Sequence, residues 1–116
     1  MKLPNIKLPE VIKLEKSSHK LVLDLFLPED LVYFEGHFSG FPIVPGVVQI
    51  QWAIQFSKDL LGDFVSSKLE RLKFSSPIFP ASKLKLIIEV NRPQQCKFLF
   101  LNDHTSFSEG VICYER

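Results

Sequence analysis

The sequence predicts an α+β domain in which an antiparallel sheet wraps around one long helix. Residues 46–61 carry apolar side chains all around a helical axis, which is typical of a buried helix. Most of the rest of the chain consists of short alternating segments separated by turn residues, which indicates strands. A helix without a polar face needs cover from a curved sheet. The 116 residues fit one domain, over residues 1–116, with no repeat or linker.

The first predicted elements are two short strands at residues 11–15 and 21–27, where apolar and polar residues alternate. Residues 17–20, Ser-Ser-His-Lys, form the turn between them. Residues 28–31 then predict a turn or a single helical turn, and residues 32–34 another extended piece.

The uncharged stretch between Glu35 and Lys58 predicts a loop followed by a helix. It contains three glycines, two prolines and three glutamines, so it is too broken and too polar for a membrane span. Pro45 suits the first turn of the helix, and Gly62 suits its end, with Lys58 in the last turn.

Four further strands follow the helix, and each is short, roughly alternating and rich in β-branched residues or Phe. They are predicted at residues 68–74, 83–90, 97–101 and 105–114. No second amphipathic helix is evident, which argues against a four-stranded sheet covered by two helices.

Composition excludes several classes of function. The formal net charge is +1 and no block of like charges occurs, so we expect neither nucleic acid nor an anionic membrane as a partner. Cys96 and Cys113 lack the spacing of a zinc site or a disulfide framework, which favours the cytoplasm and no bound metal. The first residues lack the apolar core of a signal peptide.

Two motifs carry the functional information. Residues 36–48 read Gly-His-Phe-Ser-Gly-Phe-Pro-Ile-Val-Pro-Gly-Val-Val, and residues 72–86 read Leu-Lys-Phe-Ser-Ser-Pro-Ile-Phe-Pro-Ala-Ser-Lys-Leu-Lys-Leu. Both resemble blocks of the FabA/FabZ-type 3-hydroxyacyl-[acyl-carrier-protein] dehydratases, in the same order. The Pro-Gly-Val-Val-Gln run with Trp52 further resembles the ApeI-like subgroup encoded in aryl-polyene pathways.

The resemblance implies a hotdog fold, in which two chains pair their sheets into one double-hotdog dimer or a higher homo-oligomer. It also implies that the histidine of one chain faces an acidic residue on the central helix of the other. The expected reaction is dehydration of a 3-hydroxyacyl thioester to the trans-2-enoyl form, in fatty-acid or polyene biosynthesis. The substrate arrives on the phosphopantetheine of an acyl carrier protein, and no metal or redox cofactor is required.

The chemistry of dehydration suggests roles for three positions. His37 suits the base that removes the α-proton, because an imidazole titrates near working pH. The N–H of Gly46, at the start of the helix, suits the donor that stabilises negative charge on the thioester oxygen. We expect Gly46 and its neighbour Val47 to bind the substrate, since glycine lets a ligand approach the main chain.

The sequence departs from the family at Gln51. Counted from His37, this glutamine stands where relatives have a catalytic Glu or Asp, and a carboxamide cannot donate an acid proton. Three explanations remain open: His37 moves the proton both ways while Gln51 orients the hydroxyl, the chain is an impaired partner of an active homologue, or the change is engineered. Gln51 could also be a buried amide bonded to a strand, sharing a network with Gln55.

Two other functions on the same fold stay open. One is a degenerate hotdog subunit that binds acyl thioesters or completes a heteromer. The other is an acyl thioesterase, which would also need a carboxylate to activate water.

The remaining aromatic, histidine and basic residues favour structural roles. We expect Trp52 and the phenylalanines at 98, 100 and 107 to be packing residues, and His19 and His104 to lie in surface turns. A run of basic residues on the later strands is expected to be a solvated face, with an acyl carrier protein as its other possible partner. These residues are Arg71, Lys73, Lys83, Lys85, Arg92 and Lys97.

Overall fold

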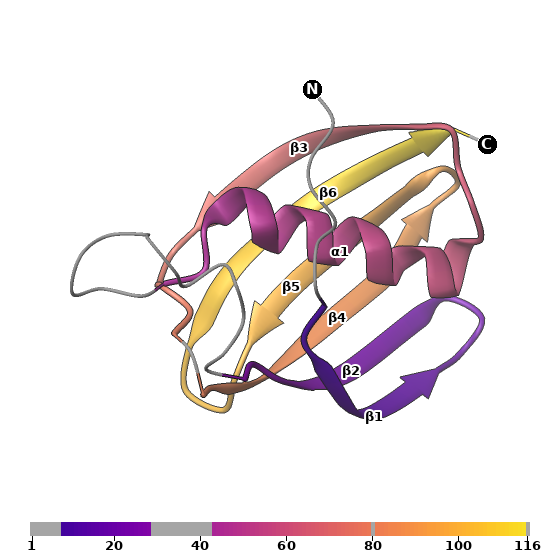
Figure 1. The fold of residues 1–116 in the computed structure, drawn as a ribbon. Coiled ribbons are helices and arrows are strands. Elements are labelled where there is room, and N and C mark those ends of the chain that lie inside the picture. The colour runs from indigo at the N-terminus through magenta and orange to yellow at the C-terminus, as the bar shows by residue number, and fades with distance from the viewer. Residues whose placement is uncertain (1–7, 29–42, 80, 116) are drawn as a thin grey trace.

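The described residues form one six-stranded antiparallel sheet with a single helix across its inner face (Figure 1). The computed structural model describes residues 8–28, 43–79 and 81–115. The strands are β1 (Glu10–Lys16), β2 (Lys20–Phe26), β3 (Ser66–Phe74), β4 (Lys83–Arg92), β5 (Gln95–Leu101) and β6 (Ser106–Glu115), and the helix is α1 (Gly46–Leu61). The strand order is β1-β2-β4-β5-β6-β3, so β1 and β3 are the two edges.

The predicted elements within the described residues are confirmed. The helix begins and ends where the sequence indicates, and each of the six strands has boundaries within two residues of the prediction. The sequence signal is strong because α1 buries one stripe and β2, β4 and β5 bury alternate residues, whereas the edge strands β1 and β3 contain no buried residue. The predicted extended piece at residues 32–34, and all but the first residue of the turn at residues 28–31, lie outside the described residues.

The core lies between the inner face of the sheet and α1. Alternate residues of the central strands point inward and are fully or almost fully buried, as the period of a half-covered strand requires. They include Leu21, Leu23, Leu25, Leu84, Leu86, Ile88, Cys96, Phe98 and Phe100. Trp52 of the helix is fully buried and meets Phe100 edge to face, with ring centroids 6.5 Å apart.

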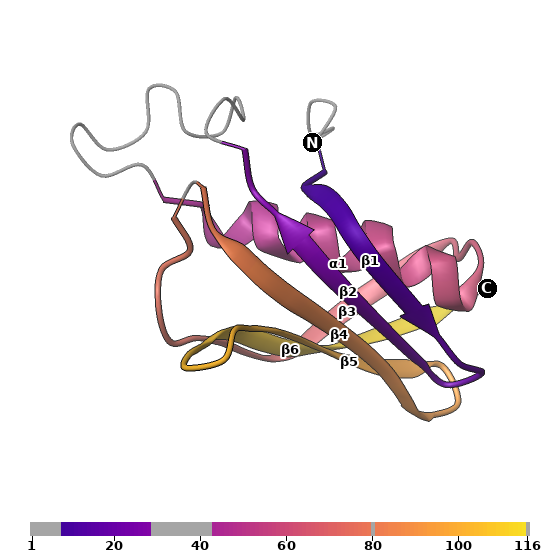
Figure 2. The same cartoon turned by 90° about the horizontal axis from the view of Figure 1, so that it is seen from below.

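The expectation that the helix is buried on all sides is wrong for the single chain. Figure 2 shows the sheet curving past α1 on one side only. Seven of the 16 helical residues are buried, among them Gln49 and Ser57, whereas Val47, Gln55 and Asp59 are exposed. The apolar residues on the outer side of the helix are therefore only partly covered by the part of the chain that the structure describes.

Both helix ends follow the prediction. Pro45 is the N-cap, and its φ of −59° already suits the start of a helix. Gly62 is the C-cap with φ 75°, and its N–H donates to the Lys58 carbonyl oxygen across 2.9 Å. A positive φ of this kind favours glycine. At the same end of the helix, Lys16 Nζ of the edge strand β1 donates to the carbonyl oxygen of Asp59 across 2.6 Å.

The edge strand β3 contains a β-bulge. Its register against β6 shifts between Glu70 and Lys73, so Arg71 and Leu72 together oppose Gly110. Arg71 adopts φ 52°, as one residue of a bulge often must. Gly110 has no room for a side chain, because an added Cβ would lie 2.6 Å from Leu72 Cδ2 and 2.7 Å from Phe98 Cε2.

Within the described residues, no helix is long and apolar enough to cross a membrane.

Candidate active site at the start of the helix

The first turn of α1 presents backbone donors without partners. Pro45 supplies no side-chain cap, and its carbonyl oxygen accepts from the N–H groups of Val48 and Gln49 at 3.0 and 3.2 Å. In the described parts of the chain, the N–H groups of Gly46 and Val47 have no acceptor. A helix N-terminus also carries partial positive charge, so it can stabilise negative charge on a nearby oxygen.

A depression of about 360 Å³ lies beside this turn. The residues around it come from the segment before the helix, from its first turn and from the end of β3 with the loop that follows. They are Ile43, Val44, Gly46, Gln49, Phe74, Ser75, Ser76 and Pro77. Three separate parts of the chain therefore meet at the helix N-terminus.

The Phe74 ring explains why residue 46 has no side chain. A Cβ at Gly46 would lie 3.0 Å from both Cε1 and Cζ of this ring. Sequence reasoning assigned the glycine to close approach of a substrate, whereas the structure adds an aromatic wall that needs the same space. Phe74 is about half exposed, so this wall borders solvent.

Gln49 is the buried amide of the site. Its side chain is 3% exposed, its Nε2 donates to the Val44 carbonyl oxygen across 3.1 Å, and its Oε1 accepts from the Ser108 hydroxyl across 2.6 Å. Ser108 lies on β6 and is also buried. The interpretation of Gln51 as a strand-bonded amide is therefore wrong, because Gln49 fills that role.

Gln51 lies on another side of the helix. A step of two residues turns the helix by about 200°, so residues 49 and 51 cannot share a face. Gln51 is half-buried, makes no side-chain hydrogen bond within the described residues and does not line the depression. Gln55 is exposed and shares no network with it. Of the predicted site residues that the structure describes, only Gly46 lies at the depression.

Two predicted site residues remain, Val47 and His37. Val47 is 54% exposed and is not among the residues that line the depression. His37 lies outside the described residues, so its predicted role as a base stays a prediction.

Sequence reasoning missed Gln49, Ser108 and Phe74. Gln49 carried a signal, because it is a polar residue on the buried stripe of the helix, and Ser108 carried a weaker one as a small polar residue in a mostly apolar strand. The predictions for Trp52 and for the phenylalanines at 98, 100 and 107 as core residues are confirmed. The exposed turn positions of His19 and His104 are confirmed too.

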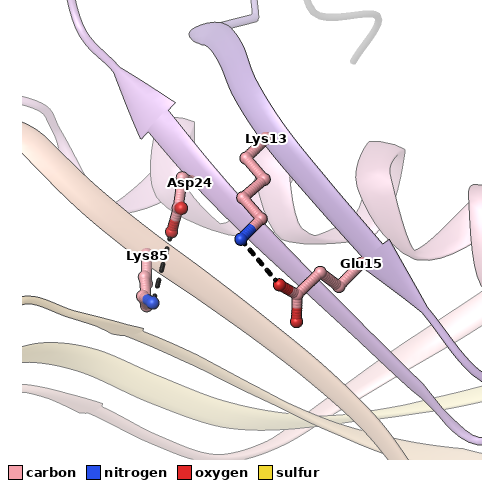
Figure 3. A network of polar contacts seen from close by, with 4 residues as sticks. All are labelled: Lys13, Glu15, Asp24 and Lys85. Carbon is pink, nitrogen blue, oxygen red and sulfur yellow. Dashed lines mark ion pairs between the residues drawn. The ribbon is translucent and has the colours of Figure 1, made fainter.

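The six basic residues do not form one surface. Lys83 and Lys85 line a depression of about 290 Å³ on the outer face, together with Asp24 and Asp103. Figure 3 shows that Lys85 is paired with Asp24, at 3.4 Å, next to the Lys13–Glu15 pair at 3.0 Å. The hydrogen bond and the charge of Glu15 raise the pKa of Lys13.

A second outer depression, of about 330 Å³, holds the other basic residues except Lys73. It is lined by Arg71, Arg92 and Lys97, with Glu109 as its acidic residue. Within the described residues these three cations form no ion pair. This end of the sheet therefore has unpaired positive charge, whereas the end near Lys85 is largely neutralised.

Both cysteines are free. Cys96 is buried on the inner face of β5, where desolvation raises the pKa of its thiol to about 12, with a smaller contribution from Cys113. Cys113 is half-buried, and Gln95 Nε2 donates to its sulfur across 3.9 Å. Within the described residues no three His, Cys, Asp or Glu side chains are grouped as metal ligands would be.

An antiparallel sheet around one helix, with open backbone donors at the start of that helix, defines a hotdog protein of the dehydratase type. The family model described as ApeI dehydratase matches residues 13–111, and the chain belongs to this ApeI-like dehydratase family. It is a branch of the FabZ-type hotdog proteins that the sequence motifs indicate.

Curated relatives agree with this assignment. The chain is 38% identical over 78 residues to the 3-hydroxyacyl-[acyl-carrier-protein] dehydratase FabZ of Novosphingobium aromaticivorans. The aligned residues cover 57% of this chain and 49% of the relative. It is 32% identical over 104 residues to FabZ of Nitratiruptor sp., and this alignment covers 75% of this chain and 68% of the relative. The chain spans about half the length of the first of these relatives.

Solved structures give the same fold. The dehydratase heterocomplex ApeI:P from Xenorhabdus doucetiae superimposes with a TM-score of 0.80 and 31% identity, over 93% of this chain and 98% of that one. Thioesterase superfamily member 2 from Mus musculus gives a TM-score of 0.69 at 12% identity, over 88% and 80%. The second likeness shows the shared fold alone.

Proposed function

We propose that this protein dehydrates a 3-hydroxyacyl thioester, carried by an acyl carrier protein, to the trans-2-enoyl thioester. The observation that carries the proposal is the uncapped start of α1, where the Gly46 N–H borders a depression in a chain of the ApeI-like dehydratase family. The FabZ relatives bear the name of this reaction.

In the proposed reaction the thioester oxygen accepts a hydrogen bond from Gly46 N–H. This contact stabilises the negative charge that develops when the α-carbon loses its proton. The helix dipole acts in the same direction. The electron pair of the broken C–H bond forms the new C2–C3 double bond, and the C3–O bond breaks as hydroxide departs with a proton as water.

His37 is the proposed base. It takes the α-proton and returns it to the departing hydroxide, so that one imidazole serves both proton transfers. Gln51 orients the hydroxyl through its carboxamide, which can accept and donate hydrogen bonds but supplies no acid proton. Its half-buried position on the uncovered side of α1 supports a role toward a second chain, and not toward the Gly46 of its own chain.

The proposed assembly pairs two chains into one sheet through β3. This edge strand carries exposed apolar side chains at Leu72 and Phe74, and Val65 directly before it is 83% exposed. An unpaired edge with exposed apolar residues is a template for another strand. The acidic carrier protein would dock at the unpaired cations of the depression that includes Arg71 and Arg92, in the cytoplasm.

A second candidate function is that of an impaired subunit which completes a heteromeric dehydratase. Gln51 in place of the family acid favours it, as does the likeness to a structure described as a dehydratase heterocomplex. In this case the chain would supply its fold and its Gly46 donor, and a homologue would supply the carboxylic acid.

The test is a panel of 3-hydroxyacyl carrier proteins, with loss of water followed by intact mass. Wild type, His37→Ala and Gln51→Glu are compared at equal concentration, with Gln55→Glu as the control for a new carboxylate elsewhere on the helix. Turnover by wild type that His37→Ala abolishes supports the first function. Turnover by Gln51→Glu alone supports the second, and silence in all variants contradicts both.

A further inference from the structure

A buried hydrogen-bonded chain links β6 to the segment that enters α1. The Ser108 hydroxyl donates to Gln49 Oε1, and Gln49 Nε2 donates to the Val44 carbonyl oxygen, at 2.6 and 3.1 Å. Gln49 and Ser108 are 3% and 2% exposed, so water does not compete for these bonds. In such surroundings each lost partner leaves a buried polar atom unsatisfied.

Val44 is held at both of its backbone polar groups. Its N–H donates to the Ile78 carbonyl oxygen across 2.9 Å, while its own carbonyl oxygen accepts from Gln49. Its side chain is 2% exposed. The peptide that precedes Pro45 is thereby fixed from two sides, by the loop before β4 and by Gln49 at the end of the first helical turn.

The fixed segment leads directly to the open donors. We call the two hydrogen bonds that hold the Val44 backbone, from Gln49 and to Ile78, the clamp. Only Pro45, whose ring restricts φ, separates Val44 from Gly46, so little freedom remains between the clamp and the Gly46 N–H. A backbone donor stabilises developing charge well only when its direction is set before the reaction. Gln49 itself borders the depression, but both of its amide heteroatoms are already engaged within the protein.

We propose that Gln49 is a positioning residue, which sets the direction of the Gly46 N–H by holding the Val44 carbonyl and is itself oriented by Ser108. This inference rests on the proposed function, because it assigns a task to the same donor. It explains why a carboxamide is buried here. An amide accepts from the hydroxyl with its oxygen and donates to the carbonyl with its nitrogen at every pH, without having to hold a titratable proton.

The first test compares Gln49→Met, Ser108→Ala and the control Gln55→Met. Gln55 lies on the same helix but is exposed and makes no side-chain hydrogen bond within the described residues, so its replacement leaves the clamp intact. We expect Gln49→Met to lower kcat roughly 10- to 100-fold with KM changed less than about twofold. Ser108→Ala should have a smaller effect of the same kind, and Gln55→Met none.

A pH signature separates positioning from mere packing. In Gln49→Glu a buried carboxyl group can donate to Val44 only while it is protonated, and burial raises its pKa. We therefore expect this variant to approach wild-type kcat at low pH and to lose it as pH rises through the raised pKa. Wild type and Gln55→Glu lack this additional loss.

A readout without turnover keeps the inference testable if no substrate is dehydrated. In ¹⁵N-labelled protein, the amide resonances of Gly46 and Val47 should shift in Gln49→Met and Ser108→Ala and stay in place in Gln55→Met. Unchanged resonances in all folded variants would overturn the positioning role, as would a kcat that stays at the wild-type value in Gln49→Met. If the Gly46 and Val47 resonances shift in these variants but the wild type dehydrates no substrate, the clamp is supported and only the proposed function is contradicted.

Discussion

The ring of Phe74 stands against Gly46, with two of its carbons 3.0 Å from the place of a Cβ on that glycine. Alanine at position 46 lowers the conformational entropy of the unfolded chain, worth about 0.4–1 kcal/mol, but its Cβ meets the ring. We expect Gly46→Ala to stabilise the chain more when Phe74 is also alanine than when the ring is present. A double-mutant cycle of urea unfolding measures this coupling. Equal effects in both backgrounds would contradict the contact.

We expect Gly110 to tolerate an added methyl group far less well than Gly46 does. Its two close neighbours are Leu72 and the buried Phe98, and the ring of Phe98 cannot move into solvent. Gly110→Ala should lower the free energy of unfolding by about 1–3 kcal/mol, the usual cost of overpacking. The loss should be smaller in a Leu72→Ala background, and chemical denaturation of the four proteins checks it.

The two thiols should differ in reactivity. Cys96 is buried, with its pKa raised to about 12, so at mildly alkaline pH it lacks both access and thiolate character. We expect an aromatic disulfide reagent to modify Cys113 first and Cys96 only after unfolding. Cys113→Ala removes the fast phase and Cys96→Ala the slow one. A fast reaction that survives in Cys113→Ala would contradict the burial of Cys96.

The raised pKa of Cys96 also predicts a pH dependence of stability. Between the ordinary value of 9.0 and about 12 the unfolded chain loses the thiol proton while the folded chain keeps it. The unfolded state then binds fewer protons, so the free energy of unfolding falls as pH rises, by up to about 1.4 kcal/mol per pH unit from this group. Cys96→Ala should lack this component when the two unfolding curves are compared.

Pairing through β3 predicts a difference between the two edges of the sheet. Val65→Asp places a charge on an 83% exposed residue beside β3, and Ile12→Asp does the same on a 55% exposed residue of β1. We expect Val65→Asp to shift the protein toward single chains, since a buried unpaired charge is costly. Light scattering after size exclusion gives the mass. Dissociation by Ile12→Asp alone would move the interface to β1.

The elements of the fold were predictable because the helix and the central strands each have a one-sided environment. Alternation identifies β2, whose residues Leu21, Leu23 and Leu25 all point to the core, and the caps Pro45 and Gly62 mark the helix ends by backbone geometry. These signals are local, because each depends only on residues within one short segment of the sequence.

The site was predictable only in part, since it depends on contacts between distant segments. Gly46 follows from the position of the helix start, whereas the Gln49–Ser108 bond joins residues 59 positions apart. Sequence periodicity does not indicate which polar residue of a helix meets which residue of a strand. For this reason the sequence left open a strand-bonded amide at Gln51, two residues from the place where the structure has one.

The bulge in β3 decides which side of the sheet Phe74 belongs to. Glu70 pairs with Val111 on the outer face, and simple alternation would send residue 74 outward as well. The extra residue at Arg71 reverses the parity, so that Phe74 pairs with the inward Ser108 and reaches Gly46. The same residues paired without the bulge would set Lys73 opposite Ser108 and turn Phe74 outward, so the bulge determines whether an aromatic ring or a charged side chain stands beside the helix start.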